Sequence, residues 1–442
     1  MKLAIIGGGG FRVPLVYRAL LDREEERRIE QVALYDTDPA RLAVMESILA
    51  AQADRARSAP AVTTSTELDQ ALSGSDFVFS AIRVGGLAGR TQDERVALKL
   101  GVLGQETTGP GGIAYGMRTV PVAMQLAERI AAVAPNAFVI NFTNPAGMVT
   151  EAMQRILGPR VVGICDTPSG LGRRIAVALG LDPARVQLDY IGLNHLGWMR
   201  GVIEGGRDHL PDLLADDERL EALEESALFG PSWLRTLGVV PNEYLYYYYC
   251  NREAVQKIAG RSETRGEFLL HQQADFYARA GADPQAALDI WQRTVSERHA
   301  LYMADAKGGR EQTDEPGGYE DVALAVMGAI TRNERSTMIL NVRNGTAVPG
   351  LDPDAVVEIP ALVDAQGAHP LATSAPDLHQ LGLMASIKAV ERHAITAATT
   401  GSAESAVRAF ATHPLVDSVS VGHALLRGYR AAIPDLDRIF TA

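Results

Sequence analysis

The sequence is poor in cysteine, has no long hydrophobic run and carries no excess of basic residues. Two of its 442 residues are cysteines, Cys165 and Cys250, which argues against a disulfide framework and for a reducing, cytoplasmic environment. No stretch reaches the roughly 18 uninterrupted apolar residues of a membrane-spanning helix. The formal net charge of −12 argues against nucleic-acid binding, which needs a concentrated basic surface. We therefore expect a cytoplasmic protein without a membrane or nucleic-acid partner, and we interpret the N-terminal MKLAIIGGGG as a first strand rather than a signal peptide.

The composition that is present is that of a globular protein. Hydrophobic residues make up 47% of the chain and charged residues 22%, and the length suits two large domains. In the first half, short strand patterns alternate with helical patterns, which is typical of a parallel sheet with right-handed crossovers. The predicted strands of this half cover residues 2–6, 31–35, 76–82, 137–142 and 161–165.

The pattern changes near Tyr190. The second half has two strand patterns and several long helical ones, and the longest predicted helical stretches cover residues 212–228, 251–280 and 382–411. We predict an α/β protein with an N-terminal Rossmann-type doubly wound parallel sheet over residues 1–190. A mixed, helix-rich α/β domain for substrate binding, catalysis and oligomerisation is predicted over residues 191–442.

A run of four glycines at residues 7–10 follows the first predicted strand and precedes a helix. Glycines at this point let the backbone approach a pyrophosphate, which binds at the helix N-terminus. Asp36 ends the second strand, where a carboxylate accepts hydrogen bonds from the ribose of NAD and repels the additional phosphate of NADP. Arg12 replaces the third glycine of the G-x-G-x-x-G motif, so a tight turn without a ligand is the alternative.

Polar residues follow three further strand patterns. They are Asn144 before Pro145, the pair Cys165 and Asp166, and His195 after Asn194. Open α/β sheets bind ligands at the carboxyl ends of their strands, and cysteine, aspartate and histidine that converge there suit a divalent metal. An ordinary Asn-Pro turn, a buried core cysteine and a structural histidine are the alternatives.

Residues 244–249 contain five tyrosines. An aromatic wall in the core or at an interface would explain such a run. Tyrosine also acts as a general base when nearby positive charge lowers its pKa.

Taken together, these segments resemble the NAD- and metal-dependent glycosidases of glycoside hydrolase family four, and within that family the 6-phospho-β-glucosidases. The similarity extends over essentially the whole chain, in matching order and spacing. It is carried by IIGGGGFRVP, ALYDTDP, GGLAGR, LGQETTGPGG, FVINFTNPAG, VGICDTP, IGLNHLGW, PNEYLYYYY, LNVRNG, VVEIPALV and THPL. The chain differs at Gly10 and Val13, where many phosphosugar members have serine and threonine.

The resemblance implies roles for individual residues. Cys165 and His195 match the residues that hold a divalent metal, usually manganese, while Tyr244 matches the general base and Asp166 the general acid. The implied substrate contacts are Arg83, Glu106, Asn144 and Arg265. The expected NAD contacts are Gly7, Gly8, Gly9, Gly10, Phe11, Arg12, Asp36, Arg41 and Asn141.

The resemblance also implies an unusual reaction, which is an exception to the two-carboxylate rule for glycosidases. NAD oxidises C3 of the sugar, the C2 proton is removed, the aglycone is eliminated, water adds, and NADH returns the hydride. A homodimer or homotetramer acting on a phosphoglycoside is expected. The alternatives are a related glycosidase for unphosphorylated or α-linked sugars, an NAD-dependent 2-hydroxyacid dehydrogenase, and a non-catalytic NAD or sugar sensor.

Overall fold

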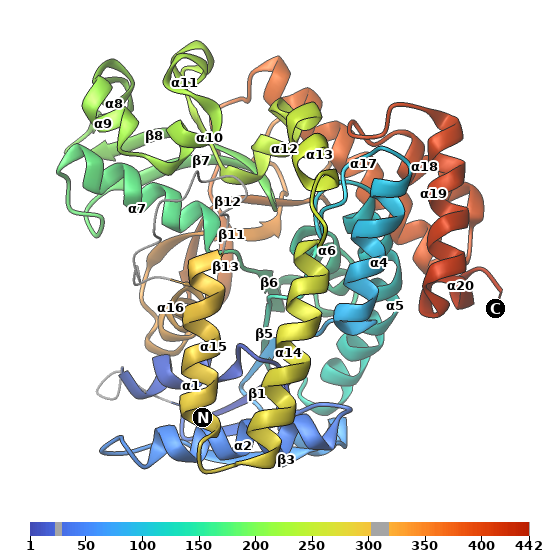
Figure 1. Ribbon diagram of the computed structural model, residues 1–442. Helices are drawn as coiled ribbons and strands as arrows, with labels where there is room; N and C mark the ends of the chain where they lie inside the picture. Colours follow the sequence, from blue (N-terminus) through green and yellow to red (C-terminus); the bar gives the residue numbers. More distant parts are fainter. Residues whose placement is uncertain (23–28, 302–317, 442) are drawn as a thin grey trace.

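The computed structural model describes residues 1–22, 29–301 and 318–441 and shows a mixed α/β molecule (Figure 1). The strands of its N-terminal half are β1 (Lys2–Ile6), β2 (Gln31–Tyr35), β3 (Ala61–Ser65), β4 (Phe77–Ser80), β5 (Phe138–Asn141) and β6 (Val161–Gly163). They are parallel and lie in the order β3-β2-β1-β4-β5-β6. Most of their residues are apolar and buried, as expected for strands covered on both faces. The predicted Rossmann-type sheet is thus confirmed.

Strands from the second half of the chain extend this sheet. They are β7 (Gln187–Leu193), β8 (Leu196–Glu204), β9 (Arg207–Asp208), β10 (Val240–Pro241), β11 (Ser336–Arg343), β12 (Val356–Asp364) and β13 (Gly367–Pro370). β11 pairs antiparallel with β6 and places Asn341 opposite Gly163, while β12 pairs with β7 and places Glu358 opposite Gly192. The described residues therefore form one 13-stranded sheet, in which antiparallel strands continue the parallel half.

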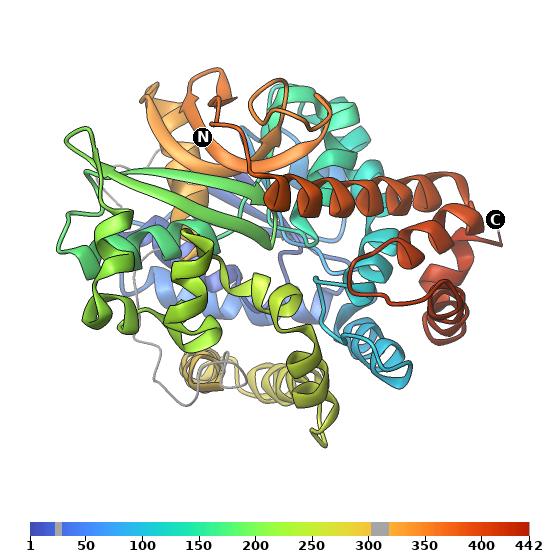
Figure 2. The same cartoon turned by 90° about the horizontal axis from the view of Figure 1, so that it is seen from above.

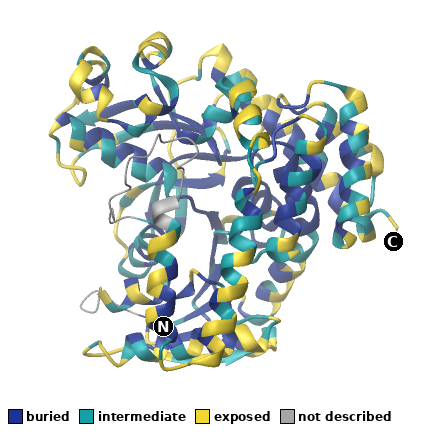
Figure 3. Cartoon of the chain, viewed as in Figure 1, coloured by how far each residue is buried: buried dark blue, intermediate teal, exposed yellow. Residues whose placement is uncertain are grey.

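Helices cover both faces of the sheet. Those of the N-terminal half are α1 (Val13–Asp22), α2 (Pro39–Ala53), α3 (Leu68–Leu72), α4 (Gly86–Lys99), α5 (Pro110–Val133), α6 (Ala146–Leu157), the 3₁₀ turn η1 (Gly158–Arg160) and α7 (Thr167–Leu179). Alternate residues of β1 point to opposite cores: Leu3 and Ile5 pack with α1 and α2, whereas Ala4 and Ile6 pack with α5 and α6. Figure 3 shows this buried interior between exposed outer helix faces.

The second half adds many helices to this frame. They are α8 (Leu210–Ala215), α9 (Asp217–Glu221), α10 (Glu224–Phe229), α11 (Pro231–Leu237), the 3₁₀ turn η2 (Glu243–Leu245), α12 (Tyr246–Tyr249), α13 (Asn251–Ala259), α14 (Arg265–Ala282), α15 (Ala287–Leu301), α16 (Tyr319–Arg332), α17 (Leu378–Thr400), α18 (Ala403–Ala411), α19 (Val419–Ala432) and α20 (Pro434–Ile439). α14 and α15 lie side by side against α2, and α17 to α20 gather beside α5 (Figures 1 and 2). No helix in the described ranges has the length and apolar character needed to cross a bilayer.

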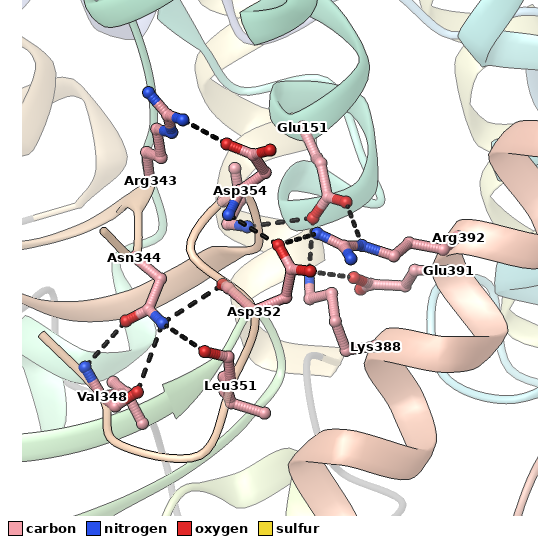
Figure 4. Close-up of polar contacts among 11 residues, drawn as sticks. Glu151, Arg343, Asn344, Val348, Leu351, Asp352, Asp354, Lys388, Glu391 and Arg392 are labelled. Atoms are coloured by element: carbon pink, nitrogen blue, oxygen red, sulfur yellow. Dashed lines mark hydrogen bonds and ion pairs between the residues drawn. The ribbon is translucent and has the colours of Figure 1, made fainter. Parts of the chain in front are cut away.

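A buried ionic network ties α17 to α6 (Figure 4). The Lys388 ammonium donates to Glu151 at 3.0 Å and also pairs with Glu391. Arg392 donates to Glu151 at 2.9 Å and to Asp352 in the loop before β12 at 3.1 Å. Because an unpaired buried charge is costly, the buried groups Glu151, Lys388 and Glu391 depend on one another to remain in place.

The three long predicted helical stretches are wrong as single elements, because local capping divides each of them. Residues 212–228 are split into parts of α8, α9 and α10, and Asp216 caps α9 by accepting from the backbone of Arg219 at 3.1 Å. Thr264 begins α14 with a capping box, which divides 251–280. Gly401, with φ +69°, ends α17, and the Ser402 side chain caps α18.

Candidate functional site

The glycine loop after β1 needs its small residues. The backbone amides of Gly7 and Gly8 both donate to the carbonyl of Tyr35, at 2.9 and 2.7 Å. A Cβ atom at Gly7 would lie 2.5 Å from the Ala81 carbonyl oxygen, and one at Gly8 2.8 Å from the Tyr35 nitrogen. Gly7 also has φ +90°. Side chains here would push the loop away from β2 and β4, so the close turn at the strand end depends on glycine.

Asp36 and the helices of the second half hold the same loop. The Asp36 carboxylate accepts from the Gly9 amide at 3.0 Å. Tyr277 of α14 donates to the Gly9 carbonyl at 2.6 Å, Trp291 of α15 to the Phe11 carbonyl at 2.8 Å and Tyr319 of α16 to the Arg12 carbonyl at 3.1 Å. The loop is thus fixed by residues more than 260 positions away in the sequence.

Phe11 serves as an anchor for this packing. Its side chain is buried, its ring meets Phe276 edge-on with centroids 5.0 Å apart, and the Arg298 guanidinium lies 3.6 Å from its ring centroid. Arg12 instead lies over the rings of Phe142 and Tyr319. The Phe11 side chain thus anchors the loop by packing, and the contacts of Phe11 and Arg12 with NAD stay predictions.

A single cavity of about 1590 Å³ collects most of the predicted site residues. Those that line it are Gly7, Gly10, Phe11, Arg12, Asp36, Arg41, Arg83, Glu106, Asn144, Cys165, Asp166, His195, Tyr244 and Arg265. They come from the carboxyl ends of the parallel strands, the first turn of α2, the loop between α4 and α5, the turn between β7 and β8, η2 and the start of α14. The topology thus brings together segments from both halves of the chain.

Gly8, Gly9 and Asn141 are the predicted residues that the cavity lining does not include. Asn141 is fully buried, and its side-chain amide donates to the Thr143 carbonyl at 3.2 Å and to the Thr150 hydroxyl at 3.1 Å. Its side-chain oxygen accepts from the Thr143 amide. These bonds shape the turn that presents Asn144, so the structure gives the Asn141 side chain a role in that turn. Its contact with NAD stays a prediction.

His195 has a strained backbone and a defined ring orientation. Its φ of +62° is unusual for a residue other than glycine, and its ring stacks on that of Tyr244 with centroids 3.7 Å apart and planes 5° apart. Nδ1 lies 2.8 Å from the Thr107 hydroxyl, and that hydroxyl lies 3.2 Å from the side-chain oxygen of Gln105. Because Thr107 donates its one proton to Gln105, it accepts from Nδ1–H, and the lone pair of Nε2 is left for a ligand.

Burial keeps both predicted metal ligands electrically neutral in this structure. It lowers the pKa of His195 to about 4, against a smaller opposing effect of Glu106. Burial raises the pKa of the Cys165 thiol well above its usual range, and the negative charges of Glu358 and Asp166 act in the same direction. A bound cation would reverse the second effect, since metal coordination stabilises a thiolate.

Arg83 and Asn144 each present an unused polar atom. Arg83 Nη2 donates to Glu106 at 2.8 Å, and Arg90 lies 2.6 Å from the same carboxylate oxygen. Burial alone would raise the pKa of Glu106, but the two guanidinium groups overcome it and lower the pKa to about 2. Within the described part of the chain, Arg83 Nη1 and the side-chain oxygen of Asn144 are buried without a hydrogen-bond partner. They are a donor and an acceptor available to a polar ligand.

Several polar residues behind the cavity were not singled out from the sequence. They are Thr107, Tyr190, Asn242, Asn341 and Glu358. The available signal was a charged residue inside an apolar strand pattern, Glu358 in VVEIPALV. Across the described residues, no cluster of three or more His, Cys, Asp or Glu side chains forms a metal site, and Cys165 and His195 both line the cavity.

Comparison with known proteins agrees with this geometry. The model of the family 4 glycosyl hydrolases matches residues 2–181, and that of their C-terminal domain matches residues 190–416. The chain is 30% identical over 437 residues to a probable 6-phospho-beta-glucosidase of Bacillus subtilis, covering 96% of this chain and 95% of the relative. It is 30% identical over 448 residues to a 6-phospho-alpha-glucosidase of Leptotrichia buccalis, covering 96% of each.

A solved structure also matches throughout. It is the 6-phospho-beta glucosidase of Thermotoga maritima with manganese, NAD⁺ and glucose-6-phosphate. The two chains are 27% identical and superpose with a TM-score of 0.84, and the match covers 99% of each chain. The two family models together span both halves of the sequence. They confirm the family that the sequence motifs resemble and decide against the dehydrogenase alternative. The chain belongs to family 4 of the glycosyl hydrolases.

Proposed function

We propose that this enzyme hydrolyses 6-phospho-β-glucosides with the help of NAD and a divalent metal. Mn²⁺ is the metal that we propose, because manganese is present in the related Thermotoga structure. The observation that carries the proposal is the single cavity shared by the glycine loop, the pair Cys165 and His195, and Tyr244. An ordinary two-carboxylate glycosidase needs neither the loop nor the pair.

The residues of the loop fit NAD. The sharp turn at Gly7 allows a pyrophosphate to approach the backbone at the start of α1. One Asp36 oxygen accepts from Gly9 and the other from Asp38, at 3.0 and 3.1 Å, and a carboxylate has further lone pairs for ribose hydroxyls. Asp36 also lines the cavity, so its charge favours NAD over NADP.

Cys165 and His195 fit a divalent metal with open coordination positions. His195 offers a neutral imidazole whose tautomer is set by Thr107, and Cys165 offers sulfur at the end of β6. Two protein ligands leave room for substrate oxygens. When bound, NAD accepts and returns a hydride, and the metal acts as a Lewis acid on sugar oxygens.

The remaining residues supply binding and proton transfer. Tyr244, held flat against His195, is the proposed base that takes the C2 proton of the sugar. Asp166 is the proposed acid that protonates the departing glycosidic oxygen. Asn144 offers its free side-chain oxygen to a sugar hydroxyl, and Arg83 and Arg265 on the cavity wall are the proposed phosphate contacts.

A substrate panel tests the proposal. Aryl glucosides in α and β forms, each with and without the 6-phosphate, are assayed with NAD and Mn²⁺. A 6-phospho-beta-glucosidase and a 6-phospho-alpha-glucosidase are each 30% identical to this chain, so both anomers belong in the panel. We expect the 6-phospho-β-glucoside to have the highest kcat/KM. Faster turnover of unphosphorylated sugars would reject the phosphate contacts, and faster turnover of the α anomer would reject the β assignment.

Location and assembly are part of the proposal. The Cys165 ligand must stay reduced, which favours the cytoplasm. A homodimer or homotetramer is the assembly that we propose for this chain. Light scattering of the purified protein tests this, and a monomer at micromolar concentration would contradict it.

A further inference from the structure

A buried carboxylate lies behind the cavity at the junction of the two kinds of strand. Glu358 of β12 is 1% exposed and accepts three hydrogen bonds. Its Oε1 accepts from Asn341 at 2.8 Å and from Asn194 at 3.5 Å, and its Oε2 accepts from the Tyr190 hydroxyl at 3.3 Å. Glu358 does not line the cavity, so it does not touch substrate.

One branch of this network leads to the metal-binding turn. Asn194 directly precedes His195, and its side-chain oxygen accepts from the Ala146 amide at 3.1 Å. That amide lies at the start of α6, two positions after Asn144. Asn194 thus connects the His195 turn to the Asn144 turn, and Glu358 holds the other end of the Asn194 amide.

The other branch leads to the proposed base. The side-chain amide of Asn242 donates to the Tyr190 hydroxyl at 2.9 Å, and the Asn242 side-chain oxygen accepts from the backbone amide of Tyr244 at 3.2 Å, capping η2. Glu358, Tyr190 and Asn242 therefore form a continuous chain of hydrogen bonds that ends at the Tyr244 backbone.

The number of protons on each group determines which group donates in each of these hydrogen bonds. Asn242 uses its acceptor oxygen for Tyr244, so its NH₂ group donates to Tyr190. The Tyr190 hydroxyl has one proton and must donate it to Glu358. The carboxylate is thus the common acceptor for both branches. An amide in its place would keep an oxygen for Asn341 and Asn194 but turn an NH₂ group toward Tyr190.

We propose that Glu358 is a positioning residue that sets Tyr244 and the Asn194–His195 turn relative to each other, through Tyr190 and Asn242 on one side and Asn194 on the other. The inference rests on the proposed role of Tyr244 as the base. One branch ends at the His195 turn and the other at Tyr244, and the rings of these two residues stack on each other. A shift in either branch would change the position of the tyrosine oxygen, and small misplacements of reacting groups are costly in rate.

The test compares four single variants of the full-length enzyme with NAD and Mn²⁺. Tyr190→Phe removes the hydroxyl that links Glu358 to Asn242 and so to Tyr244. Glu358→Gln places an NH₂ donor where the carboxylate accepts from the Tyr190 hydroxyl. Tyr244→Phe removes the proposed base itself. Tyr429→Phe is the matched control, because Tyr429 is also fully buried and its hydroxyl donates to a backbone carbonyl, that of Asp93, at 2.9 Å.

We expect Tyr190→Phe and Glu358→Gln to lower kcat by about 10–100-fold, the usual cost of a lost supporting contact, with little change in KM. The kinetic isotope effect on kcat with substrate deuterated at C2 should rise, because proton removal becomes more rate-limiting. NAD affinity should stay within about twofold, since the chain of bonds does not reach the glycine loop. Tyr429→Phe should lower Tm and leave kcat and the isotope effect unchanged.

The outcomes separate this inference from the proposed function. If Tyr190→Phe behaves like Tyr429→Phe, with a lower Tm and normal kcat and isotope effect, Glu358 is only structural and the inference is overturned. This holds even when Glu358→Gln fails to fold, because Tyr190→Phe removes a single oxygen. If Tyr244→Phe is fully active, the proposed base is wrong, whatever the other variants do.

Discussion

Replacing Tyr244 with phenylalanine is the most direct test of how this enzyme breaks the glycosidic bond. The Tyr244 ring stacks on His195 with centroids 3.7 Å apart and lies 6.4 Å from the Tyr247 centroid. Phenylalanine keeps both ring contacts and removes the oxygen alone, so the fold and NAD affinity should survive. Loss of a general base lowers the rate by about 10²–10⁴-fold. By transition-state theory this equals about 3–5 kcal/mol of lost transition-state stabilisation.

Two measurements decide the matter. Steady-state kinetics of Tyr244→Phe gives the loss in kcat, with Tm and NAD titration as controls for folding and cofactor binding. Wild-type turnover in heavy water should place deuterium at C2 of the product, because removal of that proton is unique to the elimination route. A product without deuterium at C2 would refute the mechanism. Deuterium at C2 together with a fully active Tyr244→Phe would keep the mechanism and move the base to another residue.

Four further predictions follow from the site. Asp36→Ala should narrow the preference for NAD over NADP by about tenfold or more, the scale of a lost charged hydrogen bond; calorimetry that shows the wild type preferring NADP would contradict this. Dialysis against a chelator should abolish turnover and Mn²⁺ should restore it, whereas full activity of verified metal-free enzyme would exclude a metal role for Cys165 and His195. Arg83→Ala should raise KM for 6-phosphoglucosides by about 10–100-fold while the exposed-arginine control Arg185→Ala does not, and equal KM values would remove Arg83 from the phosphate site. The pKa of Glu106 in the folded protein, about 2, lies below its ordinary value of 4.5, so its ionisation contributes a net stability of about 3 kcal/mol above pH 4.5, which is lost as the pH falls toward 2. Glu106→Gln should therefore flatten the dependence of Tm on pH in that window.

Five of the six strands of the parallel half were predictable because they carry a direct signal, whereas the partly exposed β3 (AVTTS) was not predicted. Segments such as KLAII and FVIN are apolar except for one terminal residue, and a strand buried on both faces requires a nearly continuous apolar run. The placement of β11 and β12 next to β6 was not predictable in the same way. Their pairing with the parallel half involves Asn341 opposite Gly163 and Glu358 opposite Gly192, contacts between segments far apart in the sequence.

The candidate site shows the same division. Cys165, His195 and Tyr244 were singled out by residue type and position and received their roles from the family resemblance, and the structure places all three around one cavity. Tyr190 and Glu358 were missed because their proposed role depends on the hydrogen bond between them. The two residues lie 168 positions apart, so the sequence does not show that they are partners. The sequence also gives no sign that the Asn141 side chain is hydrogen-bonded within its own turn, because those bonds depend on the local backbone geometry.

The attachment of the glycine loop to α14, α15 and α16 has a consequence for synthesis of the chain on the ribosome. The hydroxyl and indole groups that hold Gly9, Phe11 and Arg12 belong to Tyr277, Trp291 and Tyr319. The first strand therefore leaves the ribosome long before its loop can be fixed. Until β11 emerges, β6 lacks its partner on the side opposite β5 and is an unpaired edge strand. Unpaired edge strands are prone to incorrect pairing and aggregation. A nascent chain arrested before Tyr319 should bind dinucleotide poorly and recruit chaperones, although its Rossmann strands are already complete.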